Sequence, residues 1–188
     1  MVAAEQTNFP PGGADTGVLV LGLGNDILTD DAVGLHVARA AHDQLAGEPG
    51  IEVRATTEMG LALLDEISGR SAVVLVDAVQ TGRAPAGHIH EIDASTLARL
   101  SPTTPHMLGV GETLSLGRML GLPMPRHVRA FAIEVTDPFS LGTELTPLVR
   151  AAVGPTAARV VTAARDLAGA APPADRPSPA MARRQPVS

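Results

Sequence analysis

The chain has 188 residues, 45% of them hydrophobic, a formal net charge of −6, and no cysteine, tryptophan or tyrosine. This length suits one compact domain, and the apolar content suffices for a full core. The acidic balance argues against nucleic acid as the main partner, and no apolar run reaches the roughly 18 residues of a membrane span. The absence of cysteine excludes a thiol nucleophile, a disulfide framework and a thiolate metal site.

Both ends of the chain are expected to be flexible tails. Residues 1–16 and 169–188 are rich in Pro, Ala, Gly and small polar residues, which offer too little apolar surface to offset the entropy of ordering. The first segment also lacks the basic start and apolar centre of a signal peptide, which favours a cytoplasmic protein. We therefore place the folded domain at residues 17–168.

Strand and helix patterns alternate along this domain. In chain order we expect a strand at 18–23, a helix at 32–45, a strand at 51–55, a helix at 60–67, a strand at 72–76 closed by Asp77, an edge strand at 87–92, a helix at 106–120, a strand at 128–135, and a helix at 147–167 interrupted by Pro155. This alternation predicts a single three-layer α/β domain, with a mostly parallel twisted sheet of about five strands and helices on both faces.

The first strand ends in a turn with Gly22 and Gly24, and two adjacent carboxylates, Asp30 and Asp31, follow just before a helix. A dinucleotide-binding turn would need a third glycine where Ile27 stands, so the pattern disfavours a nucleotide site. Acids at a helix start can simply cap it, since the helix dipole favours them by roughly 0.3–1 kcal/mol. One acid suffices for that task, so structural and chemical roles are both open for this pair.

Asp77 and His106 could complete a site with Asp31. Asp77 directly follows a buried strand and would open onto the same crevice as Gly24, although it could equally cap the next turn. His106 begins a helix, and taken alone it is better explained as a surface residue. Together the three offer one nitrogen and two carboxylate ligands, a set that suits a borderline divalent metal. In this interpretation Asp31 is the ligand and Asp30 the helix cap.

Other candidate sites are weaker. His88 and His90 share one face of the expected edge strand and could bind a metal, but polar residues on an alternating strand more often face solvent. The chain has no G-x-S-x-G elbow, no H-E-x-x-H helix and no phosphate-binding Gly-Lys-Ser/Thr loop. The sequence therefore favours none of the hydrolase or nucleotide-binding classes that depend on these motifs.

In their order and spacing, the motifs resemble the nickel–iron hydrogenase maturation endopeptidases. The resemblance spans about residues 18–168, and the first three motifs, at 22–34, 75–78 and 104–109, are highly specific when they occur in this order. It implies an endopeptidase that removes the C-terminal extension of the hydrogenase large-subunit precursor once nickel is in place. The matching segments are Gly-Leu-Gly-Asn at 22–25 with Asp-Asp-Ala-Val-Gly at 30–34, Leu-Val-Asp-Ala at 75–78, Thr-Pro-His-Met-Leu-Gly at 104–109, Ala-Ile-Glu-Val at 132–135, and Leu-Gly-Thr-Glu-Leu-Thr-Pro at 141–147.

The resemblance also implies roles for individual residues. The family's two metal-binding carboxylates fall on Asp31 and Asp77 and its histidine on His106, which makes these three the expected catalytic residues. The divalent metal would be nickel, held by the enzyme or already seated in the substrate. Gly24 and Asn25 would offer backbone and amide donors to the peptide or its oxyanion. The expected partner is the hydrogenase large-subunit precursor, and we expect no binding to nucleic acid or to a membrane. The protein itself is expected to be a cytoplasmic monomer.

One loop departs from the family pattern. Many members carry an Asp-Gly-Gly-Thr-like loop after the second strand, whereas this chain has Ala-Thr-Thr-Glu-Met-Gly at 55–60. Glu58 is the candidate replacement for the missing acid and a candidate substrate-binding residue, so the chain could serve a different hydrogenase class. The alternative function is a non-cleaving chaperone or docking module for the nickel-loaded precursor, which the presence of all three ligand residues disfavours.

Overall fold

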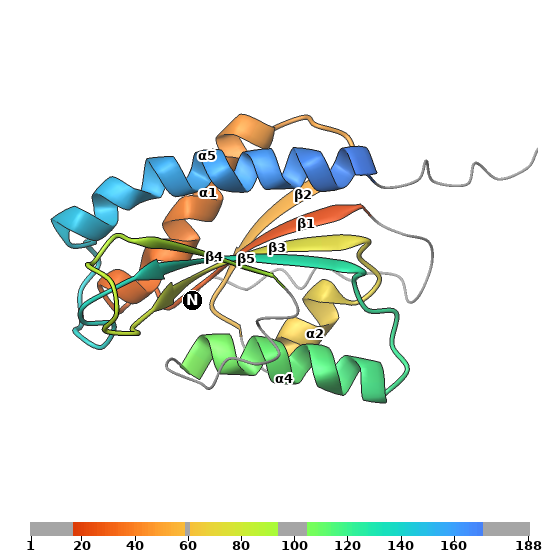
Figure 1. The fold of residues 1–188 in the computed structure, drawn as a ribbon, viewed down its shortest axis with the longest axis horizontal. Coiled ribbons are helices and arrows are strands. Elements are labelled where there is room, and N and C mark those ends of the chain that lie inside the picture. Colours follow the sequence, from red (N-terminus) through yellow and green to blue (C-terminus); the bar gives the residue numbers. More distant parts are fainter. Residues whose placement is uncertain (1–16, 59–60, 94–104, 171–188) are drawn as a thin grey trace, which may run out of the picture.

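The computed structural model describes residues 17–58, 61–93 and 105–170, with side chains from residue 110 onward in the last range. These residues form one α/β domain whose sheet has helices on both faces (Figure 1), which confirms the predicted fold class. The strands are β1 (Val18–Leu23), β2 (Ile51–Thr56), β3 (Ala72–Val79), β4 (Ile89–Asp93) and β5 (His127–Glu134), and the helices are η1 (Asp30–Ala32, a 3-10 turn), α1 (Val33–Leu45), α2 (Leu61–Ile67), α4 (Pro105–Met119) and α5 (Pro147–Ala170).

The sheet has the strand order β2-β1-β3-β5-β4. Its first four strands in this order are parallel, and β4 pairs antiparallel with β5 at the edge, where the sequence predicts an edge strand. The chain leaves β1 toward β2 on one side and returns to β3 on the other, so the order reverses between β1 and β3. In open α/β sheets such a reversal leaves a crevice at the carboxyl ends of the two strands, which is the usual place for a ligand.

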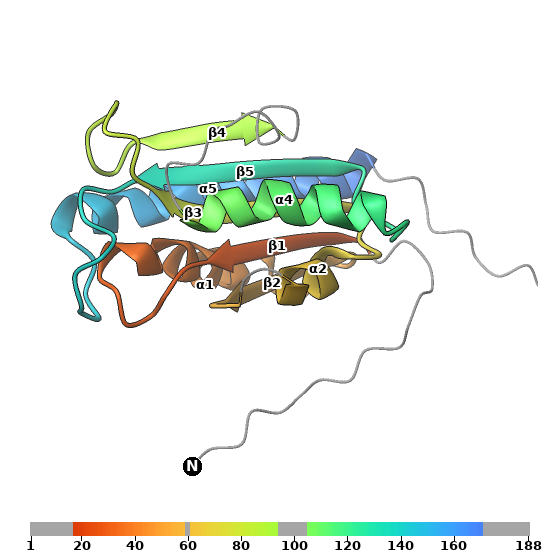
Figure 2. The same ribbon diagram turned by 90° about the horizontal axis from the view of Figure 1, so that it is seen from below.

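Two apolar layers enclose the sheet. One lies under α1 and α5 and the other under α2 and α4, which cover opposite faces (Figure 2). Every residue of β1 and β3 is buried, as expected for the central strands of a parallel sheet. Since aromatic residues make up only 2% of the chain, Val, Leu, Ile and Ala fill most of both layers.

Facing glycines bring the start of α1 close to the end of β1. A Cβ atom on Gly22 would lie 2.2 Å from the Gly34 carbonyl oxygen, and one on Gly34 would lie 2.2 Å from the Leu23 oxygen. Only a residue without a side chain permits this approach of the two backbones. The contact places η1, and with it Asp31, directly beside the carboxyl end of the sheet.

The predicted end of the third strand is wrong by three residues. β3 continues to Val79, so Asp77 lies within the strand rather than after it. The reason is the long partner strand β5, which pairs Asp77 with Ala132 and Val79 with Glu134. A local pattern does not reveal how far a neighbouring strand extends, and the apolar run ends before the hydrogen-bonded ladder does.

The expected interruption at Pro155 is also wrong, because α5 is one helix from Pro147 to Ala170. Proline has no N–H, so Pro155 leaves the carbonyl of Ala151 without its helical hydrogen bond. Both residues lie on the exposed side of the helix, where water can bind that carbonyl. The opposite side, with Val149, Thr156 and other residues, packs on the core and holds the helix together.

The predicted tails fall mostly outside the described residues. Gly169 and Ala170, which we assigned to the C-terminal tail, form the end of α5. Residues 1–16 and 171–188 are not among the residues described, so their assignment as tails stays a prediction. Among the described helices, none combines the length and apolarity required to cross a membrane.

Candidate active site

Asp31 and Asp77 lie on neighbouring segments at the carboxyl edge of the sheet. β1 and β3 are adjacent and pair Gly22 with Val76, so Asp77 is the next residue along β3, while Asp31 lies in η1, which is in contact with β3. Asp31 is 4% exposed and Asp77 is 1% exposed. Both carboxyl groups are therefore buried at the place where the strand order reverses.

The burial of two acids in one crevice has a chemical consequence. An ionised carboxylate removed from water loses several kcal/mol of hydration, which a partner of opposite charge or a set of donors must replace. One oxygen of Asp77 accepts a hydrogen bond from the Ala78 N–H at 2.8 Å. Carboxylate oxygens are good ligands for divalent metals, so the chemistry of this pair fits a metal ion.

His106 lies in the first turn of α4, which starts at the carboxyl edge of the sheet and runs back toward the amino end of β5 (Figure 2). Its backbone is therefore at the same edge as Asp31 and Asp77. Its side chain is outside the described part of the structure, so its role as a ligand stays a prediction. Among the side chains that are described, no three His, Asp or Glu residues are grouped to hold a metal ion.

The expected role of Asp30 as the cap of its own helix is wrong. Asp30 is 1% exposed and accepts hydrogen bonds from the Thr146 N–H at 2.8 Å and the Thr146 hydroxyl at 2.9 Å. Thr146 immediately precedes α5, so this carboxylate joins the loop before α5 to the segment that carries Asp31. The partner lies 116 residues away in the sequence, which is why local spacing does not reveal it.

Gly24 and Asn25 shape the turn after β1. Gly24 has a φ of 152°, and a Cβ atom there would lie 2.1 Å from the Asp31 carbonyl oxygen, so a side chain would displace Asp31. The side-chain oxygen of Asn25 accepts a hydrogen bond from the Ile27 N–H at 3.2 Å. Both residues stand at the predicted place, and the contact of either with substrate stays a prediction.

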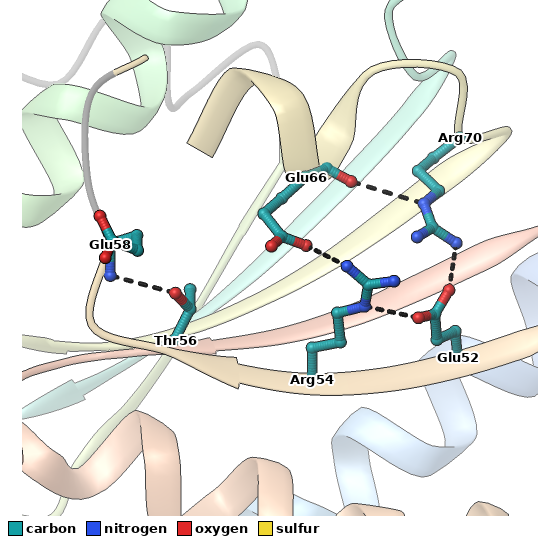
Figure 3. Close-up of polar contacts among 6 residues, drawn as sticks. All are labelled: Glu52, Arg54, Thr56, Glu58, Glu66 and Arg70. Carbon is teal, nitrogen blue, oxygen red and sulfur yellow. Dashed lines mark hydrogen bonds and ion pairs between the residues drawn. The ribbon is translucent and has the colours of Figure 1, made fainter. Parts of the chain in front are cut away.

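Glu58 is an exposed residue just beyond the end of β2. Its N–H donates to the Thr56 hydroxyl at 3.0 Å (Figure 3). β2 is the edge strand next to β1, so β1 lies between Glu58 and the strand that carries Asp77. Glu58 is therefore at the correct edge of the sheet but at the periphery of the crevice, where a long substrate could reach it.

A separate ion-pair cluster joins β2 to α2 (Figure 3). Arg54 contacts Glu52 at 2.5 Å and Glu66 at 2.7 Å, and Arg70 contacts Glu52 at 2.5 Å. Burial raises the pKa of Glu52, but the hydrogen bonds and charges of Arg70 and Arg54 outweigh it, and the net pKa is lowered. The cluster ties α2 to the edge strand.

Glu134 is a buried acid to which the sequence patterns assign no role. It lies at the end of β5, is 2% exposed, and accepts hydrogen bonds from the Thr81 N–H and hydroxyl, both at 2.7 Å, and from the Gly82 N–H at 2.8 Å. It thereby fixes the loop that follows β3, the strand of Asp77. A single charged residue inside the otherwise apolar run at 130–135 was the available signal.

His90 also contacts this acid, with 2.9 Å between its Nε2 and a Glu134 oxygen. The expectation that His90 simply faces solvent is therefore wrong, whereas His88 is exposed as expected. Burial raises the pKa of Glu134, but the hydrogen bonds from Thr81, His90 and Gly82 outweigh it, and the net pKa is lowered.

Comparison with known proteins identifies the family. The family model of hydrogenase maturation proteases matches residues 36–163, which include Asp77 and His106 and begin after Asp31. The chain is 27% identical to the hydrogenase 2 maturation protease of Escherichia coli strain K12 over 154 residues, which are 79% of this chain and 91% of that protein.

Solved structures agree with this match. The hydrogenase maturating endopeptidase HybD from E. coli superimposes with a TM-score of 0.63 at 28% identity, over 80% of this chain and 93% of that one. The [NiFe] hydrogenase maturation protease HybD from Thermococcus kodakarensis has the same fold, with a TM-score of 0.60 at 22% identity, over 81% of this chain and 99% of that one. The chain belongs to the hydrogenase maturation protease family, hydrolases of peptide bonds whose general role is the C-terminal processing of the hydrogenase large subunit.

Proposed function

We propose that this protein cleaves the C-terminal extension from a nickel–iron hydrogenase large-subunit precursor after nickel insertion, and that Asp31, Asp77 and His106 bind the metal ion that this step requires. The observation that supports the proposal is the pair of buried carboxylates, 4% and 1% exposed, at the reversal of strand order. The burial of two acids on adjacent segments removes hydration from each charge, and a bound divalent cation would offset that cost.

The residues present fit a divalent metal, and nickel already seated in the precursor would be part of the substrate. A bound metal supplies a Lewis acid that polarises the scissile carbonyl or lowers the pKa of a water molecule. In this proposal the carboxylate of Asp31 or Asp77 accepts the proton of the attacking water. His106, at the start of α4, would supply an imidazole nitrogen as the third ligand.

The turn after β1 would orient the substrate. Gly24 and Asn25 would donate hydrogen bonds to the peptide or to the oxygen that develops negative charge. The Gly24 position tolerates no side chain, since a Cβ atom would lie 2.1 Å from the Asp31 oxygen. The spacing between this turn and Asp31 therefore depends on glycine at position 24.

The proposal is tested with purified precursor in nickel-loaded and nickel-free forms and intact-mass measurement of the product. The wild-type protein is expected to shorten the nickel-loaded precursor alone, whereas Asp31→Asn is expected to leave it at full length. Asp43→Asn on the exposed side of α1 is the matched control and is expected to cleave normally.

Two results would contradict the proposal. Normal cleavage by Asp31→Asn would exclude Asp31 from the site. Binding of the nickel-loaded precursor by the wild-type protein without any change in mass would instead support the non-cleaving docking module.

A further inference from the structure

Three large apolar side chains are exposed at the carboxyl edge of the sheet, on the loops that follow β1 and β5. Ile27 is 59% exposed, Phe139 is 67% exposed and Leu141 is 80% exposed. The chain has only three phenylalanines and no tryptophan or tyrosine, so the exposure of Phe139 leaves a large part of its aromatic surface in water. Exposed apolar groups gathered on one feature are typical of a protein–protein contact.

Backbone hydrogen bonds join the two loops into one feature, which we name the apolar tip (Ile27, Phe139 and Leu141). The Thr29 N–H donates to the Ser140 oxygen at 3.0 Å, and the Gly142 N–H donates to the Ile27 oxygen at 3.0 Å, around an antiparallel bridge between residues 28 and 141. Figure 1 shows these loops side by side beyond the strand ends. The tip is therefore pre-formed, and a partner would lose little entropy in ordering it.

A second set of contacts holds the loop after β5 in place. One oxygen of Asp137 accepts hydrogen bonds from the N–H groups of Phe139 at 2.8 Å and Ser140 at 3.1 Å. At the end of the loop, Thr146 is bound by the buried Asp30. Because Asp30 directly precedes Asp31, the same segment carries both the inner end of the tip and a residue of the proposed active site.

The charges beside the tip indicate what kind of partner it fits. Asp26 and Asp137 are exposed and adjoin its apolar residues, and hydrogen bonds from Ser140 and Phe139 lower the pKa of Asp137, which keeps this carboxylate ionised. Glu144 lies against Arg150 at 2.5 Å, so it contributes little net charge. An acidic margin repels the anionic surface of a membrane and a second copy of the same tip, and it attracts lysine or arginine.

We propose that the apolar tip is the docking surface for the folded large-subunit precursor, through an apolar segment of that protein flanked by lysine or arginine. The inference rests on the proposed function, and it adds a contact outside the crevice of Asp31 and Asp77. Such a contact holds the precursor while its C-terminal extension lies across the carboxyl edge of the sheet. It acts on substrate binding and leaves the chemical step unchanged.

The test compares two double variants in steady-state cleavage of nickel-loaded precursor, with product quantified by intact mass. Phe139→Ser with Leu141→Ser is expected to raise KM by about tenfold or more and to leave kcat unchanged, because central apolar contacts dominate interface affinity. Met119→Ser with Leu120→Ser is the matched control, since these residues are 85% and 61% exposed at the far end of α4. The control is expected to retain the wild-type KM.

A charge variant tests the acidic margin. Asp26→Lys is expected to raise KM at low salt and to weaken the dependence of KM on ionic strength. The proposal is overturned if the wild-type protein cleaves the precursor while the Phe139/Leu141 double variant keeps the wild-type KM. It is also overturned if sedimentation shows a wild-type dimer that this variant lacks, or if vesicles of anionic lipid bind only the wild-type protein. Failure of the wild-type protein to cleave at all would contradict the proposed function instead.

Discussion

Acidic residues are grouped in two regions, at the carboxyl edge of β1 and β3 and between β2 and α2. The two groups differ in their burial and in their partners. Between β2 and α2, the half-buried Glu52 and Glu66 lie against Arg54 and Arg70, in pairs of 2.5–2.7 Å. At the edge, Asp31 and Asp77 are almost fully buried where the strand order reverses. Acids neutralised by neighbouring arginines hold elements together, whereas acids buried in a ligand crevice indicate chemistry.

Glu134, near the same edge, combines the burial of the first group with the structural contacts of the second. It is as buried as Asp77, yet hydrogen bonds from Thr81, Gly82 and His90 satisfy both its oxygens. Burial alone therefore does not identify a catalytic acid. Substitution can distinguish the structural role of Glu134 from the catalytic role proposed for Asp31 and Asp77. Loss of a structural acid lowers the stability of the fold, whereas loss of a catalytic acid lowers the cleavage rate.

The largest effect is expected from Asp77→Asn. The amide keeps the size of the side chain but can neither accept the proton of a water nor bind a metal as a carboxylate does. We expect the rate of precursor cleavage to fall by about 10²-fold or more, while the melting temperature stays the same or rises. Cleavage is followed by intact mass and melting by calorimetry. A large fall in melting temperature would instead assign Asp77 to the structural class of Glu134.

A smaller, structural effect is expected from Glu134→Gln. The amide removes the charge from a buried group that four donors surround, so we expect a loss of about 1–3 kcal/mol in the free energy of unfolding. Glu91→Gln, at an exposed position on β4, is the matched control. Urea unfolding at pH 7 measures both variants.

The effect at Glu134 should depend on pH in one direction. Burial raises the pKa of Glu134, but the hydrogen bonds from Thr81, His90 and Gly82 lower it by more, so its folded pKa lies below the ordinary 4.5. The carboxylate therefore stabilises the fold fully above that ordinary value, and this contribution is lost as pH falls through the folded pKa. The difference in the free energy of unfolding between wild type and Glu134→Gln should therefore shrink as the pH falls below the ordinary 4.5 and through the lowered folded pKa. A difference that grows with acidity would contradict this assignment.

Sequence patterns predict those parts of the fold that local periodicity determines. The apolar run of β1 has the predicted bounds because its residues are buried on both faces. Asp31 and Asp77 could be singled out because each stands near the carboxyl end of such a run. His106 could be singled out as a third ligand of the same set, and the family resemblance gives it the same role, but a single sequence cannot show its surroundings.

Other features depend on contacts between distant residues, and local spacing does not predict them. Asp30 bonds Thr146 across 116 positions, and Glu134 bonds Thr81 across 53. In both cases the sequence shows the acid without its distant partner, and the acid then fits a helix cap or a strand end equally well. The predicted interruption at Pro155 is wrong for a related reason, since the effect of a proline on α5 depends on which side of the helix faces solvent.

The smallest effect is expected from Arg54→Met, which removes the charge at the centre of the ion-pair cluster and keeps much of the apolar stem. Its side chain is partly exposed and so is that of Glu66, so solvent screens the pair. We expect a loss of about 0.5–1 kcal/mol in the free energy of unfolding, smaller at high salt, with no change in kcat or KM for the precursor.

A double-mutant cycle with Glu66→Gln tests whether this loss comes from the pair itself. Arg54 and Glu66 are 2.7 Å apart, so they should show a coupling energy of a few tenths of a kcal/mol or more. Urea unfolding of the four proteins at low and high salt gives that energy. If Arg54→Met instead reduces cleavage without a loss of stability, the cluster on β2 takes part in substrate binding, and its arginines would then belong with Glu58 to the periphery of the active site.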